Sequence, residues 1–243
     1  MRRMPNNIHC SPLSNLLNNP FLTLPNPYRT LSNLLSNPYL ALPNGRHRDL
    51  LGRSNVDTLE SVNLLAIVYA NQEPPKFIRA EKMYQDCLKR RRDTLGDAHP
   101  LTLSTMHNLA LLYDVHKEYD QAESLFRECV DLKSTTLGAL DPSALRSLHA
   151  QAMCLIHQER WEDAQPLLHD CVEKRKEALG PKHIDTASTM GAYADCLYQL
   201  RKYDIAQPIY VNVVVAVKEN YGGNHPRSVK ATNDLRQCRS FLY

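Results

Sequence analysis

Outside an N-terminal segment, the chain places apolar residues at the three- and four-residue spacing of a helix that is buried on one face. Leu109, Ala110 and Tyr113 form one such face. After a polar turn, Ala122 and Phe126 form another. The same two sets recur further along the chain, so the pattern predicts antiparallel helix pairs joined by short turns.

The pattern repeats every 42 residues, and each unit is marked by a pair of residues that ends in glycine. The pairs are Leu51-Gly52, Leu95-Gly96, Leu137-Gly138, Leu179-Gly180 and Tyr221-Gly222, with spacings of 44, 42, 42 and 42. Shortly after each of the last four comes a helix-start signal: His99-Pro100, Asp141-Pro142, His183-Ile184 and His225-Pro226. Glycine suits the residue after a helix and proline suits the first helical position, so each pair marks one helix ending and the next beginning.

Small residues recur where paired helices are expected to cross. They are Ala66, Ala110, Ala152 and Ala194 in the first helices and Ala80, Ala122, Ala164 and Ala206 in the second helices. Helices approach closely where the side chains at the crossing are small. One pair cannot bury its apolar face alone, so the repeats must stack. The sequence predicts an all-α solenoid with repeats at about 55–96, 97–138, 139–180 and 181–222, closed by a polar capping helix at 224–242.

The first 48 residues contain no Asp or Glu, and the stretch 13–26 recurs as 31–44 with eleven of fourteen positions identical. Prolines in both copies exclude long helices and central strands, so we expect residues 1–54 to be a disordered, low-complexity segment. An acid-free segment bearing arginine also fits an organellar transit peptide, and the NPFL and NPYL sequences fit a short linear motif. The sequence alone does not separate these alternatives.

Composition restricts the partners and the compartment. The net charge of +3 gives no support to a nucleic-acid or acidic-membrane partner, and no apolar stretch approaches the ~20 residues of a membrane span. Seven cysteines without a CxxC pair favour a reducing compartment. We therefore expect a cytoplasmic protein, or an organellar one if residues 1–48 act as a transit peptide.

The chain carries no motif for catalysis, a cofactor or a metal. A phosphate-binding glycine loop, a GxSxG elbow and an HExxH helix are all absent from the sequence. Six cysteines fall in two repeat registers, which is typical of buried packing, and the histidines that begin helices share a register with Asp141, which indicates capping. We expect no enzymatic activity, no cofactor and no metal.

Two basic runs, at 89–92 and 174–176, occupy the same part of the second helix in repeats one and three. Basic residues near a helix C-terminus interact favourably with the helix dipole. We therefore interpret the runs as a solvated face, with a nucleic-acid patch as the alternative.

The residues Leu109-Ala110-x2-Tyr113 and Ala122-x3-Phe126 resemble the tetratricopeptide consensus. With its LG...HP junction, NLALLY at 108–113 and YDQAESLF at 119–126, the 42-residue unit resembles the repeats of kinesin light chains and nephrocystin-like proteins. The resemblance covers about residues 55–243 and implies a right-handed solenoid. Kinesin light chains also have a heptad coiled coil, and this chain shows no sustained heptads.

The resemblance further implies a concave groove lined by the first helices. Its expected partner-binding residues are Asn63, Ser104, His107, Asn108, Arg146, His149, Ser188, Lys230 and Asn233. Asn and His can bond a peptide backbone, while Arg146 and Lys230 can bind acidic side chains.

These observations predict a monomeric interaction scaffold or adaptor that binds a protein or peptide partner, with no small-molecule substrate. One alternative is a cargo adaptor of the kinesin light chain type. The other is an RNA-binding helical repeat, which usually needs a strongly basic face.

Overall fold

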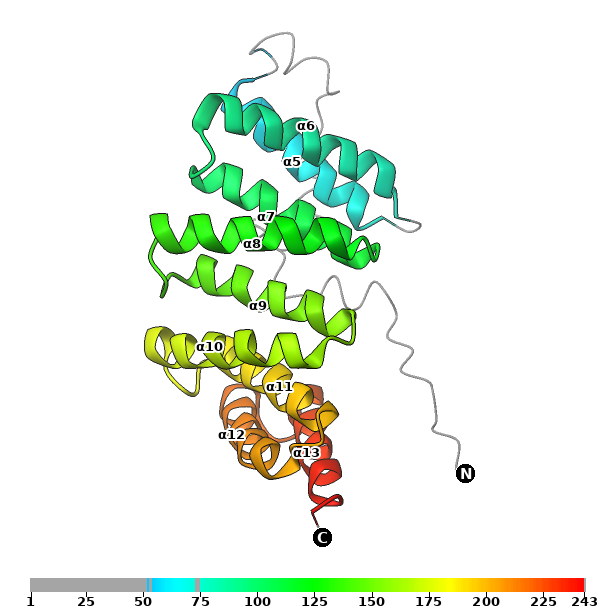
Figure 1. The fold of residues 1–243 in the computed structure, drawn as a ribbon, viewed down its shortest axis with the longest axis vertical. Helices are drawn as coiled ribbons and strands as arrows, with labels where there is room; N and C mark the ends of the chain where they lie inside the picture. The colour runs from blue at the N-terminus through cyan, green and yellow to red at the C-terminus, as the bar shows by residue number, and fades with distance from the viewer. Residues whose placement is uncertain (1–51, 53, 73–74, 243) are drawn as a thin grey trace. The chain divides into compact units, whose positions relative to one another are not determined.

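The computed structural model describes residue 52 and residues 54–72 and 75–242, which form nine helices and no strand (Figure 1). The helices are α5 Val56–Ala70, α6 Phe77–Leu95, α7 Pro100–Val115, α8 Tyr119–Thr136, α9 Pro142–His157, α10 Trp161–Leu179, α11 Ile184–Gln199, α12 Tyr203–Tyr221 and α13 Pro226–Arg239. The duplicated segment at 13–44 lies outside the described residues. The chain divides after Gly96 into an N-terminal unit and a C-terminal unit, which are described separately.

The predicted helix starts are confirmed by their caps. Asp141 accepts a hydrogen bond from the backbone N–H of Ser143 at 2.7 Å. At α7, α11 and α13, a histidine Nδ1 accepts the corresponding backbone N–H at 3.1 to 3.2 Å. These histidines therefore satisfy orphan amides of the first helical turn.

The predicted helix ends are also observed. Gly180 follows α10 with a φ of 90°, and its N–H donates to the carbonyl of Lys176 at 3.0 Å. A side chain at this φ would strain the backbone, which explains why glycine recurs at the same register.

All eight crossing alanines are fully buried, with 0% exposure. Large residues one turn further along the second helices, such as Phe126 and Leu168, are buried beside them. Close helix approach at small residues, with large side chains filling the flanks, is the packing that the sequence pattern predicted.

In the N-terminal unit, α5 packs against α6. The thiol of Cys87 donates to the carbonyl of Leu59 at 3.3 Å, and the buried guanidinium of Arg91 pairs with the partly exposed carboxylate of Glu60. Arg91 belongs to the first basic run, so this run is not a solvated face throughout.

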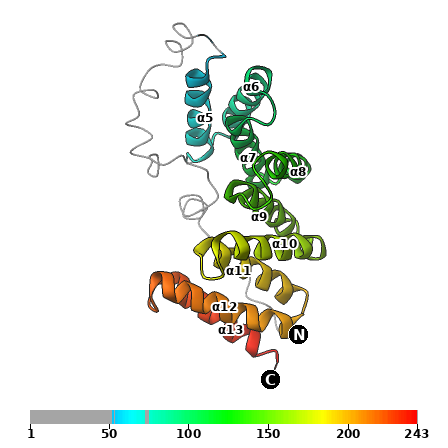
Figure 2. The ribbon, with the colours of Figure 1, turned by 90° about the vertical axis from the view of Figure 1, so that its left-hand side faces the viewer.

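In the C-terminal unit, each helix packs against the next, and consecutive first helices also touch, α7 with α9 and α9 with α11. No comparable contact joins α8 to α10 among the described residues. Figure 2 shows helices α7 to α13 following one another along the C-terminal unit. The first helices therefore form the closer-packed layer of the stack.

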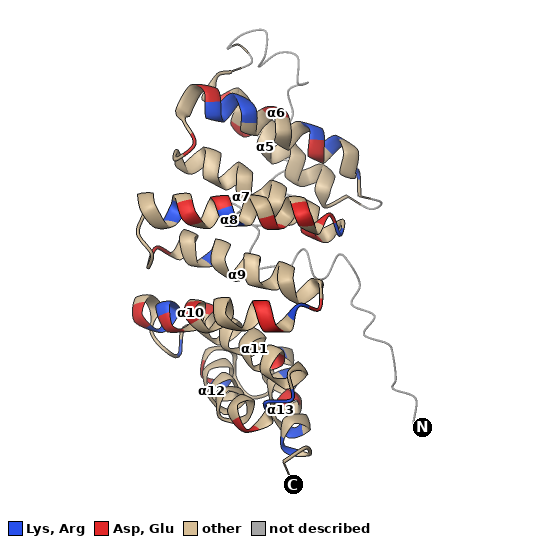
Figure 3. Ribbon diagram, viewed as in Figure 1, with Lys and Arg blue, Asp and Glu red and all other residues tan. Residues whose placement is uncertain are grey.

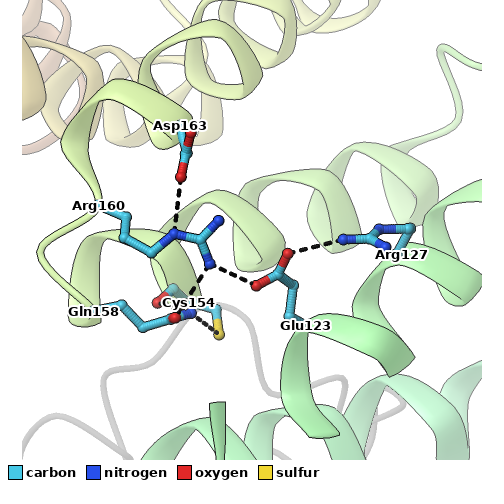
Figure 4. A network of polar contacts seen from close by, with 6 residues as sticks. All are labelled: Glu123, Arg127, Cys154, Gln158, Arg160 and Asp163. Carbon is cyan, nitrogen blue, oxygen red and sulfur yellow. Dashed lines mark hydrogen bonds and ion pairs between the residues drawn. The ribbon is translucent and has the colours of Figure 1, made fainter. Parts of the chain in front are cut away.

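Side-chain ion pairs and hydrogen bonds link consecutive repeats at the turns before α10 and α12. Arg160 reaches Glu123 of α8 at 2.9 Å and Asp163 of its own helix at 2.8 Å (Figure 4). One repeat later, Lys202 donates to Gln165 at 2.7 Å. In both cases a basic residue just before a second helix bonds to a side chain that lies 37 residues earlier in the sequence.

The six described cysteines are buried, which confirms that they pack in the interior. Second-helix thiols donate to first-helix carbonyls, as Cys129 does to Leu103 at 3.5 Å. Burial raises the pKa of the Cys171 thiol to about 11, so it stays protonated and unreactive.

The last helix, α13, packs on α12 through Ala231 and Cys238. Beyond it, the ring of Phe241 stacks on Tyr203 with centroids 5.0 Å apart. Within the described ranges, no helix combines the length and apolar character needed to cross a bilayer.

Candidate partner-binding face

The first-helix face of the C-terminal unit is the surface formed by α7, α9, α11 and α13. Five of the predicted binding residues on these helices are accessible to solvent, to different extents. Ser188, Lys230 and Asn233 are exposed, and Ser104 and Arg146 are partly exposed. Lys230 pairs with Asp234 at 3.1 Å on its own helix. The structure therefore places a set of polar side chains along this face, spread over four helices.

The other predicted binding residues, Asn63, His107, Asn108 and His149, are buried, with at most 3% of their surface exposed. His107 and His149 lie between consecutive first helices, where each meets a hydroxyl of the next one. Because a partner would not reach these four side chains, we leave them out of the proposed site.

His107 belongs to a buried polar triad that joins three helices. Its Nδ1 lies 3.1 Å from Ser147 Oγ of α9, and Lys133 Nζ of α8 donates to the same hydroxyl at 2.9 Å. Lys133 also donates to the carbonyl of Ser143 at 3.4 Å. The triad thus ties α7, α8 and α9 together through one serine oxygen.

The same triad recurs 42 residues later. Arg175 of α10 donates to Thr189 Oγ1 of α11 at 2.8 Å, and this hydroxyl lies 3.2 Å from His149 Nδ1 of α9. Arg175 also donates to the carbonyl of Asp185 at 2.7 Å. A second-helix cation, a hydroxyl on the next first helix and a histidine on the previous one therefore form a repeated unit.

Neither buried cation forms an ion pair with a carboxylate within the described residues; Asp141 and Asp185 act on them only electrostatically. Burial lowers the pKa of Lys133 and of Arg175. Burial, with the nearby charge of Arg175, lowers the pKa of His149 to about 3, so its ring is neutral. Each triad therefore places a basic side chain in the interior without a carboxylate paired to it.

The third set of equivalent positions, in the packing of α11, α12 and α13, is apolar. Gly191, Val217 and Ala231 stand where the second triad has histidine, arginine and threonine. Val217 and Ala231 belong to a buried apolar cluster with Met190 and Val213. All three members of the triad have changed together, which indicates that they act as one packing unit.

Arg146 of α9 lies next in sequence to Ser147 and is close enough to both buried cations to lower their pKa values. Among the described residues, its guanidinium makes no hydrogen bond and no ion pair. The middle of the first-helix face therefore carries a partly exposed arginine whose charge acts on two buried basic side chains.

The basic runs do not form continuous exposed patches. Arg91 and Arg175, which are equivalent positions of the two runs, are buried. The residues before them, Arg90 and Lys174, form ion pairs within their own helices, with Asp86 and Asp170. Figure 3 shows acidic residues interspersed with the basic ones along α6 and α10. The interpretation of the runs as a solvated face is wrong for Arg91 and Arg175. These two residues occupy the position in the repeat at which the triads have their buried basic side chain.

Sequence reasoning missed the triads. The signal was present in three series with the 42-residue period: the cations at 91, 133 and 175, the hydroxyls at 105, 147 and 189, and the histidines at 107 and 149. No motif connects these series, since each triad draws on three helices and spans about 40 residues.

The fold and this face define a helical-repeat interaction scaffold, a class that presents extended surfaces to protein partners. The family model described as tetratricopeptide repeat matches residues 57–135 and 143–211, more than half of the chain. The chain therefore belongs to the tetratricopeptide repeat family.

Solved structures show the same fold. Two structures of the nearly identical TPR-like repeats of a proposed kinesin light chain from Podosopora anserina, one carrying a single substitution, have a TM-score of 0.66 and 22% identity, covering 75% of this chain and 85% of the other. BtubC (BKLC) from P. vanneervenii has a TM-score of 0.63 and 17% identity, covering 80% of each chain. No curated protein matches the sequence.

Proposed function

We propose that this protein is a non-catalytic adaptor whose first-helix face binds a peptide or helix of a protein partner, with Arg146 receiving an acidic group. The observation that carries the proposal is the unpaired guanidinium of Arg146 in front of the buried charges of Lys133 and Arg175. A carboxylate at this point gains a charge-assisted, bidentate hydrogen bond and lowers the repulsion among the three cations.

Flanking side chains suit a partner in an extended or helical conformation. Ser188 follows Arg146 by one repeat and is exposed, and Ser104 precedes it by one repeat and is partly exposed. Hydroxyls both donate and accept hydrogen bonds, so they can satisfy backbone groups of a bound segment on either side of its acidic residue.

The experiment is affinity purification of the full chain with mass spectrometry, comparing wild type with Arg146→Glu. The matched control is Arg127→Glu, which makes the same charge change on α8, where Arg127 is 65% exposed. We expect Arg146→Glu to lose partners that wild type and control retain, with all three proteins equally helical. Capture of the same partners by Arg146→Glu would refute this site.

A narrower function is suggested by the structural likeness to repeats of a proposed kinesin light chain. In that form, the adaptor would link cargo to a microtubule motor. The same purification tests it, because a motor chain must be among the captured proteins. If no motor chain is captured, the general adaptor remains and the motor link is withdrawn.

The interior thiols suit a reducing compartment, and we place the protein in the cytoplasm as part of this proposal. Expression of the full chain with a fluorescent tag at its C-terminus tests this placement. Accumulation of the tag inside an organelle would instead support a transit function for residues 1–48.

A further inference from the structure

The outward stripe of α12 differs from those of the other second helices of the C-terminal unit. At four equivalent positions, α8 has Gln121, Ser124, Glu128 and Asp131, α10 has Asp163, Pro166, Asp170 and Glu173, and α12 has Ile205, Pro208, Asn212 and Val215. We call these last four residues the α12 stripe. Its charged positions have been replaced by apolar and neutral ones.

The stripe is exposed. Ile205 and Val215 have 46% and 44% of their surface accessible, whereas no large apolar residue of α8 or α10 is exposed. Helix α12 carries three charged residues, Asp204, Lys218 and Glu219, all near its ends, while α8 carries six and α10 eight. Figure 3 shows the charged residues along α8 and α10.

Packing among the residues that the structure describes does not account for the stripe. The buried side of α12, which meets α11 and α13, is formed by Ala206, Tyr210, Val213, Ala216 and Val217. The stripe residues lie between these positions along the helix, on its opposite side. Solvent-exposed apolar residues at helical spacing, at positions that are polar or charged in the other repeats, are typical of a contact with another protein.

We propose that the α12 stripe binds the same stripe of a second copy of this chain, with the two α12 helices antiparallel about a two-fold axis. The stripe is self-complementary in this arrangement. Ile205 and Val215 lie five residues on either side of position 210, so each Ile205 would pack on Val215 of the other copy.

The charges at the two ends of the stripe also match this symmetry. Arg201 and Glu219 each lie nine residues from position 210 and are exposed. Among the described residues, Arg201 makes no hydrogen bond through its side chain and no ion pair, and Glu219 pairs with Lys182 at 2.8 Å. In the antiparallel pair, Arg201 of each copy would face Glu219 of the other.

Asn212 gives the pair its register. Asn212 lies two residues beyond position 210, where the two-fold axis crosses each helix. The Asn212 side chains of the two copies would therefore be offset by about 6 Å along the helices, within reach of each other. A polar residue at such a position specifies orientation at some cost in affinity. A lipid surface would need clustered Lys or Arg, and the stripe has none.

The dimer is independent of the proposed function, because α12 lies in the second-helix layer and leaves the first-helix face open. The sequence alone had favoured a monomer. A contact of one helix from each copy is small for a specific interface, so we expect a dissociation constant on the order of 10 µM.

Sedimentation velocity of the full chain, from about 1 to about 200 µM, tests the proposal around that dissociation constant. We expect a monomer–dimer equilibrium in wild type. Ile205→Asp and Val215→Glu, which place the residues of α10 at these positions, should each weaken the dimer about tenfold or more, since a buried unpaired charge costs more than 1.4 kcal/mol. Ile78→Asp, at an exposed isoleucine of α6, is the control and should leave the dimer unchanged.

The register is tested separately with Asn212→Cys under mild oxidation. In a Cys10→Ser background, we expect a cross-linked dimer that the background protein and an Asp170→Cys control, at the equivalent position of α10, do not form. A constant monomer mass up to the highest concentration would overturn the proposal. So would a dimer that survives both Ile205→Asp and Val215→Glu, or an α12 stripe that is occupied by a different protein.

Discussion

The imidazole of His157, at the end of α9, lies 2.9 Å from the carboxylate of Asp114, near the end of α7. Asp114 is 6% exposed in its side chain and His157 is 46% exposed. The hydrogen bond to Asp114 raises the pKa of His157 above its usual value. This pair closes the ends of two neighbouring first helices and makes their packing sensitive to pH.

Stability from this pair should be present at acidic pH and lost in base. A raised folded-state pKa means that the native state binds the proton more tightly, so the contribution is complete below the unfolded pKa of about 6.5 and disappears as the pH rises through the folded value. We expect His157→Gln to cost up to about 1 kcal/mol at about pH 6 and much less at about pH 9, given the exposure of the imidazole.

Urea denaturation of wild type and His157→Gln at the two pH values measures this difference, since urea leaves the ion pair unscreened. His169→Gln, at an exposed histidine of α10, is the control. An equal cost of His157→Gln at both pH values would contradict the pairing.

The buried triads should behave as coupled units. In wild type, Ser147→Ala removes the hydroxyl that joins Lys133 to His107 and should cost about 1–3 kcal/mol. In a Lys133→Met background, the cation is gone and the same change should cost less. Urea unfolding of the four proteins of this double-mutant cycle measures the coupling.

Thr189→Ala with and without Arg175→Met repeats the cycle in the second triad. Additive effects in both cycles would mean that the cation and the hydroxyl do not act together. Coupling in both would show that the triad is a repeated device of this solenoid.

A charge at a helix crossing should be poorly tolerated. Ala152 is fully buried among Leu155, Ala164 and Leu168. Ala152→Asp should lower the free energy of unfolding by about 3–5 kcal/mol, because the carboxylate has no partner there. Gln151→Asp adds the same charge one residue away, at a partly exposed position, and should change stability little. Equal melting temperatures of Ala152→Asp and wild type would refute this packing.

Asp195 of α11 is a carboxylate in a position where the other repeats have Ile67, Leu111 and Met153. Tyr210 donates to it at 2.6 Å, yet burial raises its pKa. Since the native state then binds the proton more tightly than the unfolded chain, this residue costs stability as the pH rises from the unfolded pKa of about 3.9 through its folded pKa, and the cost is complete above the folded value.

Asp195→Asn removes the charge and keeps an acceptor for Tyr210. We expect a gain of about 1 kcal/mol at neutral pH that shrinks towards about pH 4. Thermal unfolding of wild type and Asp195→Asn across this pH range measures it. Tyr210→Phe is the companion variant and should be destabilising at neutral pH, because the carboxylate loses its donor.

Local signals in the sequence determined the helices and their pairing. The cap at Asp141 and the glycine at 180 each act on residues within one turn, and a crossing alanine such as Ala152 needs only to be small. Such features depend on backbone geometry and side-chain size, which are readable at each position. The same local signals identified the tetratricopeptide repeat.

Tertiary structure alone decided which polar side chains reach the solvent. His107 and Arg146 occupy first helices in registers that the sequence assigned to one groove, yet the histidine is buried against Ser147 and the arginine is partly exposed. The reason is that the exposure of a residue in a stack depends on the repeats on either side of it. Those neighbours lie about 40 residues away, beyond the reach of any local pattern.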